Sequence, residues 1–325
     1  MNVQPISVAQ YGIGPIGAEI ARLLLTKPWV KLVAAVDIDP KKIGKDLGEV
    51  VGLGRNVGLK VTADLQGKPE VVCHSTGSRL REVSSQLKSL LERGSHVVST
   101  SEELSFPLDQ AIRNELQQVA RSHNVTLLGT GVNPGFVMDK LPLTLTAVCQ
   151  SIESIEIIRI QNASTRREPL QRKVGAGMTP EEFRKAVAAG KIKHMGLRES
   201  LMLVGNGLGV EFEKVSDEKI EAIVAHKEVV TKYLKVAPGQ VAGVHQTIEA
   251  KGKINVRLEL RMYVGAEDVA ADRVIVRGVP NLEMEIKEGV HGDRATAAMV
   301  VNSIPRVVSA RPGVLTMDDI PISFR

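Results

Sequence analysis

Two rhythms of apolar and polar positions alternate along the first 132 residues. Short apolar runs of strand length are separated by longer stretches in which apolar residues recur with helical spacing. The strand-like runs are ISVAQYG (6–12), VKLVAAV (30–36), EVVCHST (70–76), SHVVST (95–100) and VTLLGTG (125–131), and helical patterns cover 17–26, 79–94 and 107–124. This alternation predicts a doubly wound parallel sheet with helices on both faces, the α/β architecture of a Rossmann domain.

Residues typical of helix ends mark several boundaries. Gly94 stands where a glycine commonly ends a helix, and Pro107 suits the first turn of the next one. Thr179 is expected to cap a later helix, with Pro180 in its first position and Glu182 completing a capping box.

From about residue 135 the chain becomes rich in β-like runs. SIESIEIIRIQN alternates like a half-buried strand, whereas SDEKIEAIVAH predicts a helix over 216–226. Three long runs, at 243–252, 254–265 and 272–289, are typical of antiparallel meanders. A final helical pattern follows in 292–313, which Asp293 is expected to cap and Pro305 to end or kink. We therefore expect three parts: a nucleotide-binding domain over 1–132, an α+β domain over 133–289, and a C-terminal helix and tail over 290–325.

The motif YGIGPIG follows the first predicted strand and opens a helix. Gly12 permits a tight turn, Gly14 lets a diphosphate approach the backbone, and Gly17 allows close packing of helix on strand. The free N–H groups and the positive end of the helix dipole favour phosphate at this point. We therefore expect a dinucleotide to bind along the turn, which also contains Ile13, Pro15 and Ile16.

Asp37 ends the second predicted strand, where an acidic residue binds the adenosine ribose hydroxyls of NAD. An acid here disfavours the 2′-phosphate of NADP. Lys41 and Lys42 follow closely and either bind that phosphate or form a solvated face. The residues therefore leave NAD, NADP or dual use open.

The carboxyl ends of the other predicted strands are expected to line the same crevice. They contribute Thr76 and Gly77, then Ser101, then Asn133 and Pro134. The last two stand where the chain leaves the nucleotide domain and are expected near the nicotinamide, unless they form only an ordinary turn at the domain exit. Phe136, just beyond, is a candidate substrate contact.

Glu102 and Glu103 stand side by side just past a buried strand. Because neighbouring side chains at a strand end point apart, one acid is expected to face the crevice. The other faces solvent or the next helix, and Glu103 is expected to serve the helix that begins near Pro107. A carboxylate about 4 Å from an ammonium or iminium group gains about 4 kcal/mol in a partly dry cleft, and it can also transfer a proton. The alternative is that both acids only cap or solvate a loop.

Composition narrows the class of protein. The 325 residues are 43% hydrophobic and 24% charged, with a net charge of +5 and only 3% aromatic residues, which argues against a nucleic-acid stacking surface. No apolar run approaches the ~20 residues of a membrane helix. Cys73 and Cys149 are too few for a disulfide framework, so a reducing cytoplasm is the expected compartment. The basic run STRREPLQRK is either a solvated loop or an anion site.

The remaining polar residues give weaker signals. The histidines are dispersed without metal-ligand spacing, so no metal is expected. His74 lies inside a predicted buried strand and is expected to be a hydrogen-bonded core histidine. His194 either reaches a substrate pocket or lies exposed. One of the residues that end the alternating strand is a candidate to face the cleft: Arg159, Gln161 or Asn162.

Five segments together resemble the 2,4-diaminopentanoate dehydrogenase group of native amine dehydrogenases, often labelled dihydrodipicolinate reductase-like. They are YGIGPIG, STSEELSFP, GTGVNPGFVMDKLP, RKVGAGMTPEEF and GDRATAAMVVNSIP, and the resemblance covers nearly the whole chain. The chain lacks the His-His-x-x-Lys-x-Asp-Ala-Pro-Ser-Gly-Thr-Ala run of dihydrodipicolinate reductase itself.

The resemblance implies NAD(P)-dependent oxidative deamination of a small amine, reversible as reductive amination of a ketone with ammonia. It also implies that Glu102 is the catalytic acid and that Asn302 approaches the nicotinamide. The second domain would supply the substrate pocket and the contacts of a homodimer, and the C-terminal helix would return to the nucleotide domain. Two alternatives remain open: a reductase of a cyclic imine or carbonyl, and a nicotinamide-binding sensor without turnover.

Overall fold

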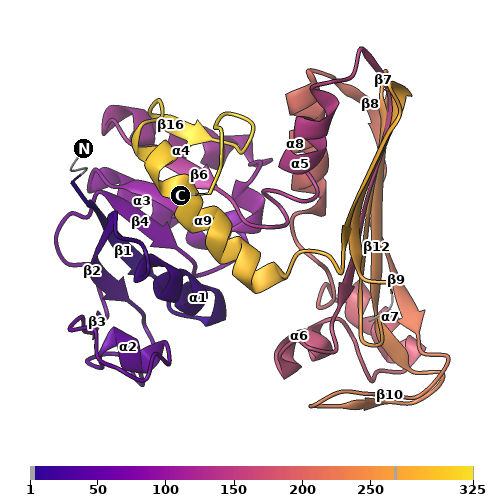
Figure 1. Cartoon of the computed structure of the whole chain (residues 1–325), viewed down its shortest axis with the longest axis horizontal. Helices are drawn as coiled ribbons and strands as arrows, with labels where there is room; N and C mark the ends of the chain where they lie inside the picture. Colours follow the sequence, from indigo (N-terminus) through magenta and orange to yellow (C-terminus); the bar gives the residue numbers. More distant parts are fainter. Residues whose placement is uncertain (1–3, 267–268, 325) are drawn as a thin grey trace. The chain divides into compact units, whose positions relative to one another are not determined.

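The computed structural model describes residues 4–266 and 269–324, and the chain divides into two compact units. Unit 1 holds the residues up to Phe136 and those from His291 on, and unit 2 is Val137–Val290 (Figure 1). The boundaries expected from the sequence, after residues 132 and 289, lie four residues and one residue before these. Residues 1–3, 267–268 and 325 of the expected ranges lie outside the described residues.

Unit 1 is built on a seven-stranded sheet in the order β3-β2-β1-β4-β5-β6-β16, and all of its neighbouring strands are parallel. Its strands are β1 (Ile6–Tyr11), β2 (Val30–Val36), β3 (Val61–Thr62), β4 (Val71–His74), β5 (His96–Ser99), β6 (Thr126–Gly129) and β16 (Gly313–Leu315). The order reverses between β1 and β4, and ligands of open α/β sheets bind at the carboxyl ends of the strands at such a point.

Helices cover both faces of this sheet (Figure 1). They are α1 (Pro15–Leu24), α2 (Leu47–Val50), α3 (Leu80–Glu92), α4 (Gln110–Ser122) and α9 (Gly292–Val308), with a 3₁₀ turn η1 (Glu102–Leu104) after β5. Helix α9 packs beside α1 and contacts β4, β5 and β6, whereas α3 and α4 pack together. The doubly wound parallel sheet is therefore confirmed, and α9 packs against it.

Several expected boundaries in unit 1 are corrected. Gly94 follows α3 with a φ of 75°, as expected. Helix α4, however, begins at Gln110 rather than near Pro107, because the Asp109 carboxylate accepts a hydrogen bond from the N–H of Ile112 (3.2 Å) and caps the helix. His291, not Asp293, is the N-cap of α9.

The C-terminal end of the chain also differs from the expectation. Helix α9 continues past Pro305 to Val308, so the proline does not end it. The helical pattern expected over 292–313 then gives way to β16, which extends the sheet of unit 1 beside β6.

Unit 2 is built on a mixed sheet in the order β15-β14-β7-β13-β12-β8, with β9 also paired to β12. Its strands are β7 (Ser151–Asn162), β8 (Phe212–Val215), β9 (Lys219–Val224), β12 (Val241–Gly252), β13 (Asn255–Tyr263), β14 (Ala271–Val279) and β15 (Leu282–Lys287), and a small hairpin is formed by β10 (Val229–Val230) and β11 (Lys235–Val236). The expected antiparallel meander is only partly right, because β13 runs parallel to β7. A parallel neighbour needs a long crossover, and the helices between β7 and β12 lie in that connection.

The helices of unit 2 lie along one face of this sheet (Figure 1). They are α5 (Lys140–Thr146), α6 (Glu168–Lys173), α7 (Pro180–Ala188) and α8 (Leu197–Leu208). The capping box of α7 is confirmed, since Thr179 and Glu182 satisfy each other's backbone N–H groups. The helix expected over 216–226 is wrong: Lys219–Val224 alternates with period two and pairs with β12 as strand β9. In the part of the chain that the structure describes, every helix is too short or too polar to cross a bilayer.

Candidate active site

The turn between β1 and α1 requires glycine at two of its three motif positions. A Cβ atom at Gly12, where φ is +87°, would lie 2.6 Å from the carbonyl oxygen of Ser75. A Cβ atom at Gly17 would lie 1.9 Å from the carbonyl oxygen of Gly12. A Cβ atom at Gly14 would meet nothing within 4 Å. Gly12 and Gly17 are therefore fixed by packing, whereas Gly14 borders open space.

That open space lies at the N-terminus of α1. Gly14 is the N-cap and offers no side chain, and Pro15 occupies the first turn. The first hydrogen bond back to Gly14 comes from the N–H of Ala18 (2.8 Å). The amides before Ala18 therefore have no carbonyl within the helix to bind, which is the arrangement that receives phosphate groups.

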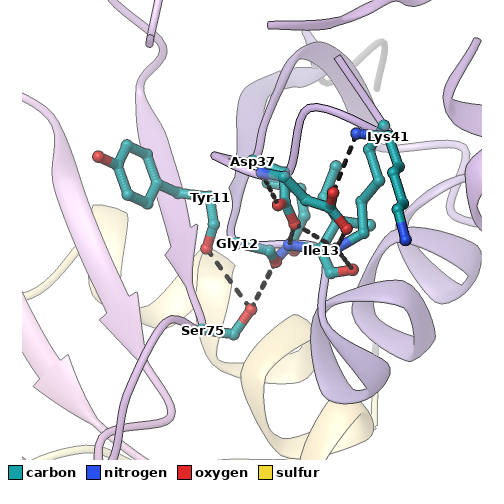
Figure 2. Close-up of polar contacts among 9 residues, drawn as sticks. Tyr11, Gly12, Ile13, Asp37, Lys41 and Ser75 are labelled. Atoms are coloured by element: carbon teal, nitrogen blue, oxygen red, sulfur yellow. Dashed lines mark hydrogen bonds and ion pairs between the residues drawn. The ribbon is translucent and has the colours of Figure 1, made fainter. Parts of the chain in front are cut away.

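Asp37, directly after β2, is bonded to the same turn (Figure 2). Its carboxylate accepts hydrogen bonds from the N–H of Ile13 (2.8 Å), the N–H of Asp39 (2.9 Å) and Nζ of Lys42 (2.9 Å). Lys42 Nζ also donates to the carbonyl oxygen of Ile13 (3.1 Å). Burial raises the pKa of Asp37, but the contacts with Lys42 and the two backbone N–H groups outweigh it and lower the pKa below the usual value. Asp37 is therefore a fixed carboxylate beside the glycine turn.

The residue at the switch point, Ser75, ties β4 to the glycine turn. Its hydroxyl donates to the carbonyl oxygen of Gly12 (2.8 Å) and accepts from Nε2 of the buried Gln10 (2.9 Å). Thr76 is exposed and Gly77 is half-buried just beyond it. Both expected cofactor residues thus follow the strand that lies across the switch point from β1.

Asn133 and Pro134 follow β6 and are buried. Asn133 is 9% exposed. Both polar atoms of its side-chain amide are buried, and neither has a hydrogen-bond partner among the described residues. A buried amide without partners is costly, so this residue fits a ligand-binding role better than an ordinary turn at the domain exit. Phe136 is half-buried at the end of the same segment.

The two neighbouring acids do not end a strand, which corrects the geometric argument made from the sequence. Strand β5 ends at Ser99, and Glu102 and Glu103 begin the 3₁₀ turn η1. Glu103 Oε2 accepts a hydrogen bond from the N–H of Leu80 (2.7 Å) and so serves the N-terminus of α3 rather than that of α4. Glu102 is half-buried in the same turn. Glu103 therefore binds the N-terminus of α3, and Glu102 lies beside it in the same short turn.

Asn302 lies on α9, half-buried on the helix that contacts β4, β5 and β6. Its expected approach to the nicotinamide stays a prediction. The buried Ser101 is the N-cap of η1, and its hydroxyl donates to the carbonyl oxygen of Ser78 (2.9 Å). Its backbone position places it between β5 and the two acids.

In unit 2, Arg159 is already paired. Its guanidinium Nη1 contacts both carboxylate oxygens of Asp272 (2.6 and 2.7 Å), and Nη2 donates to the carbonyl oxygen of Val290 (2.9 Å). Both side chains are about 3% exposed. Burial opposes the ionisation of both groups: it lowers the pKa of Arg159 and raises the pKa of Asp272, although the charge of each group favours the charged form of the other. Arg159 is thus held by Asp272 and Val290, and its guanidinium is less available to contact a substrate than the sequence suggested.

His194 lies in a cationic environment. It is half-buried rather than exposed, and its ring nitrogen Nδ1 is buried without a hydrogen-bond partner among the described residues. Burial first, and then the positive charges of Lys173 and Arg159, lower its pKa to about 4. Arg166, which is 7% exposed, adds a further positive charge that acts on Arg159. We call Arg159, Arg166, Lys173 and His194 the basic cluster of unit 2.

No pattern in the sequence indicated that this cluster forms. Arg166 and Lys173 were recognised only as part of a basic run, whereas in the structure Lys173 acts on His194 and Arg166 acts on Arg159. Gln161 is buried on the same strand as Arg159. Asn162, by contrast, is occupied locally, since its Oδ1 accepts from the N–H of Ser164 (2.8 Å). Among residues 4–266 and 269–324, no group of three or more histidine, cysteine or acidic side chains could hold a metal ion.

Comparisons with known proteins agree with this geometry. The model of the 2,4-diaminopentanoate dehydrogenase C-terminal domain matches residues 136–324. The chain is 30% identical over 336 residues to 2,4-diaminopentanoate dehydrogenase of Acetoanaerobium sticklandii, covering 98% of this chain and 94% of that protein. The chain belongs to the 2,4-diaminopentanoate dehydrogenase family. The family assignment made from the sequence motifs is therefore confirmed.

Two further proteins that are similar to this chain carry the name amine dehydrogenase. The protein from Streptomyces virginiae is 25% identical over 351 residues, covering 98% of this chain and 96% of that protein. The solved structure from Mycobacterium smegmatis superimposes with a TM-score of 0.86 at 26% identity, covering 98% of this chain and 97% of that chain. These names belong to oxidoreductases that act on CH–NH₂ groups, the enzyme class expected from the sequence.

Proposed function

We propose that this member of the 2,4-diaminopentanoate dehydrogenase family is an NAD(P)-dependent amine dehydrogenase. In the reaction, a primary amine, NAD(P)⁺ and water give a ketone or aldehyde, ammonia, NAD(P)H and a proton. The observation that carries the proposal is the position of Glu102, a half-buried acid on a short turn after β5, at the carboxyl edge of a sheet whose glycine turn fits a dinucleotide.

Four features of unit 1 fit the cofactor. The space in front of Gly14 accepts a diphosphate, and the N-terminal amides of α1 would bind it. Asp37 stands where the adenosine ribose hydroxyls are bound, and the unpartnered amide of Asn133 suits the nicotinamide carboxamide. When bound, the nicotinamide supplies the hydride acceptor for oxidation and the hydride donor for reductive amination.

The protein's own contribution to the chemistry centres on Glu102. As a carboxylate it stabilises the positive charge of the bound ammonium. After the ammonium has lost a proton to water, the free amine gives up hydride to the cofactor, and the carboxylate stabilises the iminium that forms. It then accepts a proton from the water that attacks the iminium carbon, and in reverse it returns that proton to the departing hydroxyl. General acid–base help of this kind is typically worth roughly 10²–10⁴ in rate.

The basic cluster of unit 2 concentrates positive charge, because Lys173 and Arg159 act on His194, and Arg166 acts on Arg159. This charge is compatible with a substrate that carries a carboxylate. A low pKa keeps His194 neutral, so its buried Nδ1 can form a hydrogen bond with the substrate without adding a charge. A name among the relatives, 2,4-diaminopentanoate, is that of an amino acid with such a carboxylate. We therefore assign amino acids, and the corresponding oxo acids, as the preferred substrate class.

The proposal is tested with a matched pair of carbonyl compounds. The protein is incubated with NADH or NADPH, ammonium, and either 4-oxopentanoate or 2-pentanone, and the loss of reduced cofactor is followed by absorbance. We expect oxidation that requires ammonium and is faster with 4-oxopentanoate. Oxidation without ammonium would show a carbonyl reductase, and tight cofactor binding without turnover on a wider panel would show a sensor; either result contradicts the proposal.

Cofactor choice is expected to depend on Asp37 and Lys42. Asp37→Ala removes the acid that repels a 2′-phosphate and releases Lys42 Nζ from its 2.9 Å contact, so it should shift preference toward NADP(H). Lys42→Met should shift preference toward NAD(H). Lys41→Met is the matched control, because Lys41 is exposed and its backbone, not its side chain, bonds to Asp39.

The ratio of kcat/KM for the two cofactors measures this effect. A ratio that stays constant in Asp37→Ala, or that moves toward NAD(H), would show that Asp37 does not bind the ribose. An equal shift in Lys41→Met and Lys42→Met would show that general surface charge, rather than the contact with Asp37, sets the preference.

A homodimer is expected from the uncovered face of the unit 2 sheet. Alternate residues of β7, β13 and β14 point away from α5 and α8, and they include the half-buried Ile158 and Ile275. On the same face Glu259 is 2% exposed and pairs with Arg257 (2.7 Å) and with Arg261. A face that mixes apolar groups with charges of both signs can match a second copy of itself across a twofold axis.

Light scattering tests this assembly. The wild-type protein is expected at twice the 35.1 kDa mass of the chain at micromolar concentration. Ile158→Glu, at the centre of the uncovered face, should give the monomer. Val148→Glu is the control, because Val148 is 67% exposed but lies outside the sheet strands. A wild-type monomer, or a dimer that survives Ile158→Glu unchanged, would contradict the proposed interface.

The compartment is proposed on chemical grounds only. Cys73 and Cys149 are both free thiols. Two free thiols are compatible with a reducing environment, and we propose the cytoplasm. Fractionation of cells that produce the protein, followed by its detection in the membrane or secreted fraction alone, would contradict this.

A further inference from the structure

A buried histidine lies next to the segment that carries the two acids. His74 ends β4 and Ser99 ends β5, the two residues pair across the sheet, and both are 0% exposed. His74 Nδ1 is 2.9 Å from the hydroxyl of Ser99. His74 Nε2 is 3.0 Å from Oε1 of Gln86 and 2.9 Å from the hydroxyl of Thr76. As expected from the sequence, His74 is a hydrogen-bonded core residue.

The partners of His74 fix the direction of every bond. The amide oxygen of Gln86 can only accept, and it already accepts from the hydroxyl of Thr76 (2.7 Å), so the proton of the ring must lie on Nε2. Nδ1 then accepts from the hydroxyl of Ser99. Burial holds the pKa of His74 at about 4, so the ring stays neutral and keeps this single tautomer.

The Ser99 hydroxyl links the His74 ring to the backbone just before η1, the turn that contains Glu102 and Glu103. Its oxygen accepts a hydrogen bond from the N–H of Ser101 (3.1 Å), the residue directly before Glu102. The other side of the turn is held by two bonds to the carbonyl oxygen of Ser78, one from the hydroxyl of Ser101 (2.9 Å) and one from the N–H of Glu103 (3.2 Å). Tyr11 stacks on the His74 ring with centroids 5.8 Å apart and fixes its plane.

From this chain of bonds we propose that His74 is a positioning residue for Glu102. The ring orients the hydroxyl of Ser99, Ser99 binds the backbone that enters η1, and the carboxylate of Glu102 is thereby held where it acts. This inference rests on the catalytic role proposed for Glu102. It goes beyond that role, because it assigns a function to His74 and Ser99, neither of which is expected to touch substrate or cofactor.

Two substitutions of His74 separate positioning from packing. His74→Leu fills the space of the ring but offers no acceptor, whereas His74→Asn keeps a carbonyl oxygen two bonds from Cβ, as Nδ1 is, and leaves a smaller side chain. If the bond to Ser99 matters, His74→Leu should lower kcat by about tenfold or more, since small misplacements of catalytic groups can cost up to about 10², and His74→Asn should retain clearly more activity. A higher kcat in His74→Leu than in His74→Asn would show that the ring only fills space and would overturn the proposal.

Ser99→Ala is a second variant, and it removes only the hydroxyl that links His74 to the backbone before Glu102. It leaves the contacts of His74 with Gln86 and Thr76 in place and removes one oxygen atom from the core. We expect a loss of kcat similar to that of His74→Leu, with the Kd of NAD(P)H unchanged. Unchanged kcat in a folded Ser99→Ala protein would overturn the proposal even if the His74 variants fail to fold.

The double variant Ser99→Ala/Glu102→Gln distinguishes a failure of this inference from a failure of the proposed function. If Ser99 acts through Glu102, its substitution should change kcat by less than about twofold once Glu102 has lost its charge, because coupled residues are not additive. A further loss of about tenfold in the double variant would overturn the positioning role while the function of Glu102 stands. Near-normal turnover in Glu102→Gln alone would instead remove the proposed acid, and the positioning role with it.

Discussion

Glu102→Gln should lower kcat by roughly 10²–10⁴, the usual range for lost acid–base help, and should leave the affinity for NAD(P)H nearly unchanged. The substitution keeps the shape of the side chain and removes its charge. Without a cation, a partly buried carboxylate is driven toward its neutral form, and a bound ammonium reverses this preference. Substrate and acid therefore stabilise each other's charged forms, and the amide cannot replace either effect.

Glu103→Gln is the matched control for this prediction. Its Oε2 accepts from the N–H of Leu80 at the start of α3, a bond that an amide oxygen can still make. We expect a much smaller loss of turnover and a small loss of stability. Steady-state kinetics of the two variants side by side, with cofactor binding measured for each, decide the matter. If Glu103→Gln alone abolishes turnover, or Glu102→Gln retains it, the roles of the two acids are wrong.

Arg159→Met should destabilise unit 2 by about 3–5 kcal/mol, the usual cost of breaking a buried ion pair on one side. Asp272 is 2% exposed and would be left without its two-point partner. Arg159→Met/Asp272→Leu should recover most of this loss, because it removes the buried charge as well. Calorimetric unfolding of the three proteins measures the effect.

The effect of pH on this variant follows from the pKa of Asp272. Burial already raises that pKa in the wild-type protein, and loss of the arginine raises it further. The native state of Arg159→Met then binds a proton that the unfolded state releases, so its stability falls as pH rises and the deficit shrinks as pH falls. If the single variant is as stable as the wild type, or if the double variant is less stable than the single one, Arg159 is not held by Asp272 and its role as a direct substrate contact returns.

Unit 1 could be predicted well because its signals are local. The glycine turn, the acid after β2 and the alternation of strands with helices each lie within a short segment, and the parallel order follows from the crossovers. The acids after β5 were placed at the correct edge of the sheet, but they lie in a 3₁₀ turn rather than at a strand end. Nothing in STSEEL distinguishes these two backbone conformations.

Unit 2 could be predicted less well because its determinants are distant in the sequence. The segment Lys219–Val224 contains helix-forming residues, but its apolar residues also recur at every second position. It forms a strand because it pairs with β12. Arg159 pairs with Asp272, which lies 113 positions later in the sequence. His74 was recognised as a core histidine, but its link to Ser99 and η1 required the register of β4 beside β5.

Amine formation is tested most directly by following nitrogen and hydride into the same product. The protein is supplied with ¹⁵N-ammonium, 4-oxopentanoate and NADH or NADPH carrying deuterium at the transferable position, and the product is analysed by mass spectrometry and NMR. We predict 4-aminopentanoate with both ¹⁵N and deuterium on carbon 4, and almost none of it from Glu102→Gln. Deuterium on carbon 4 of a 4-hydroxy acid, with no ¹⁵N in the product, would contradict an amine dehydrogenase.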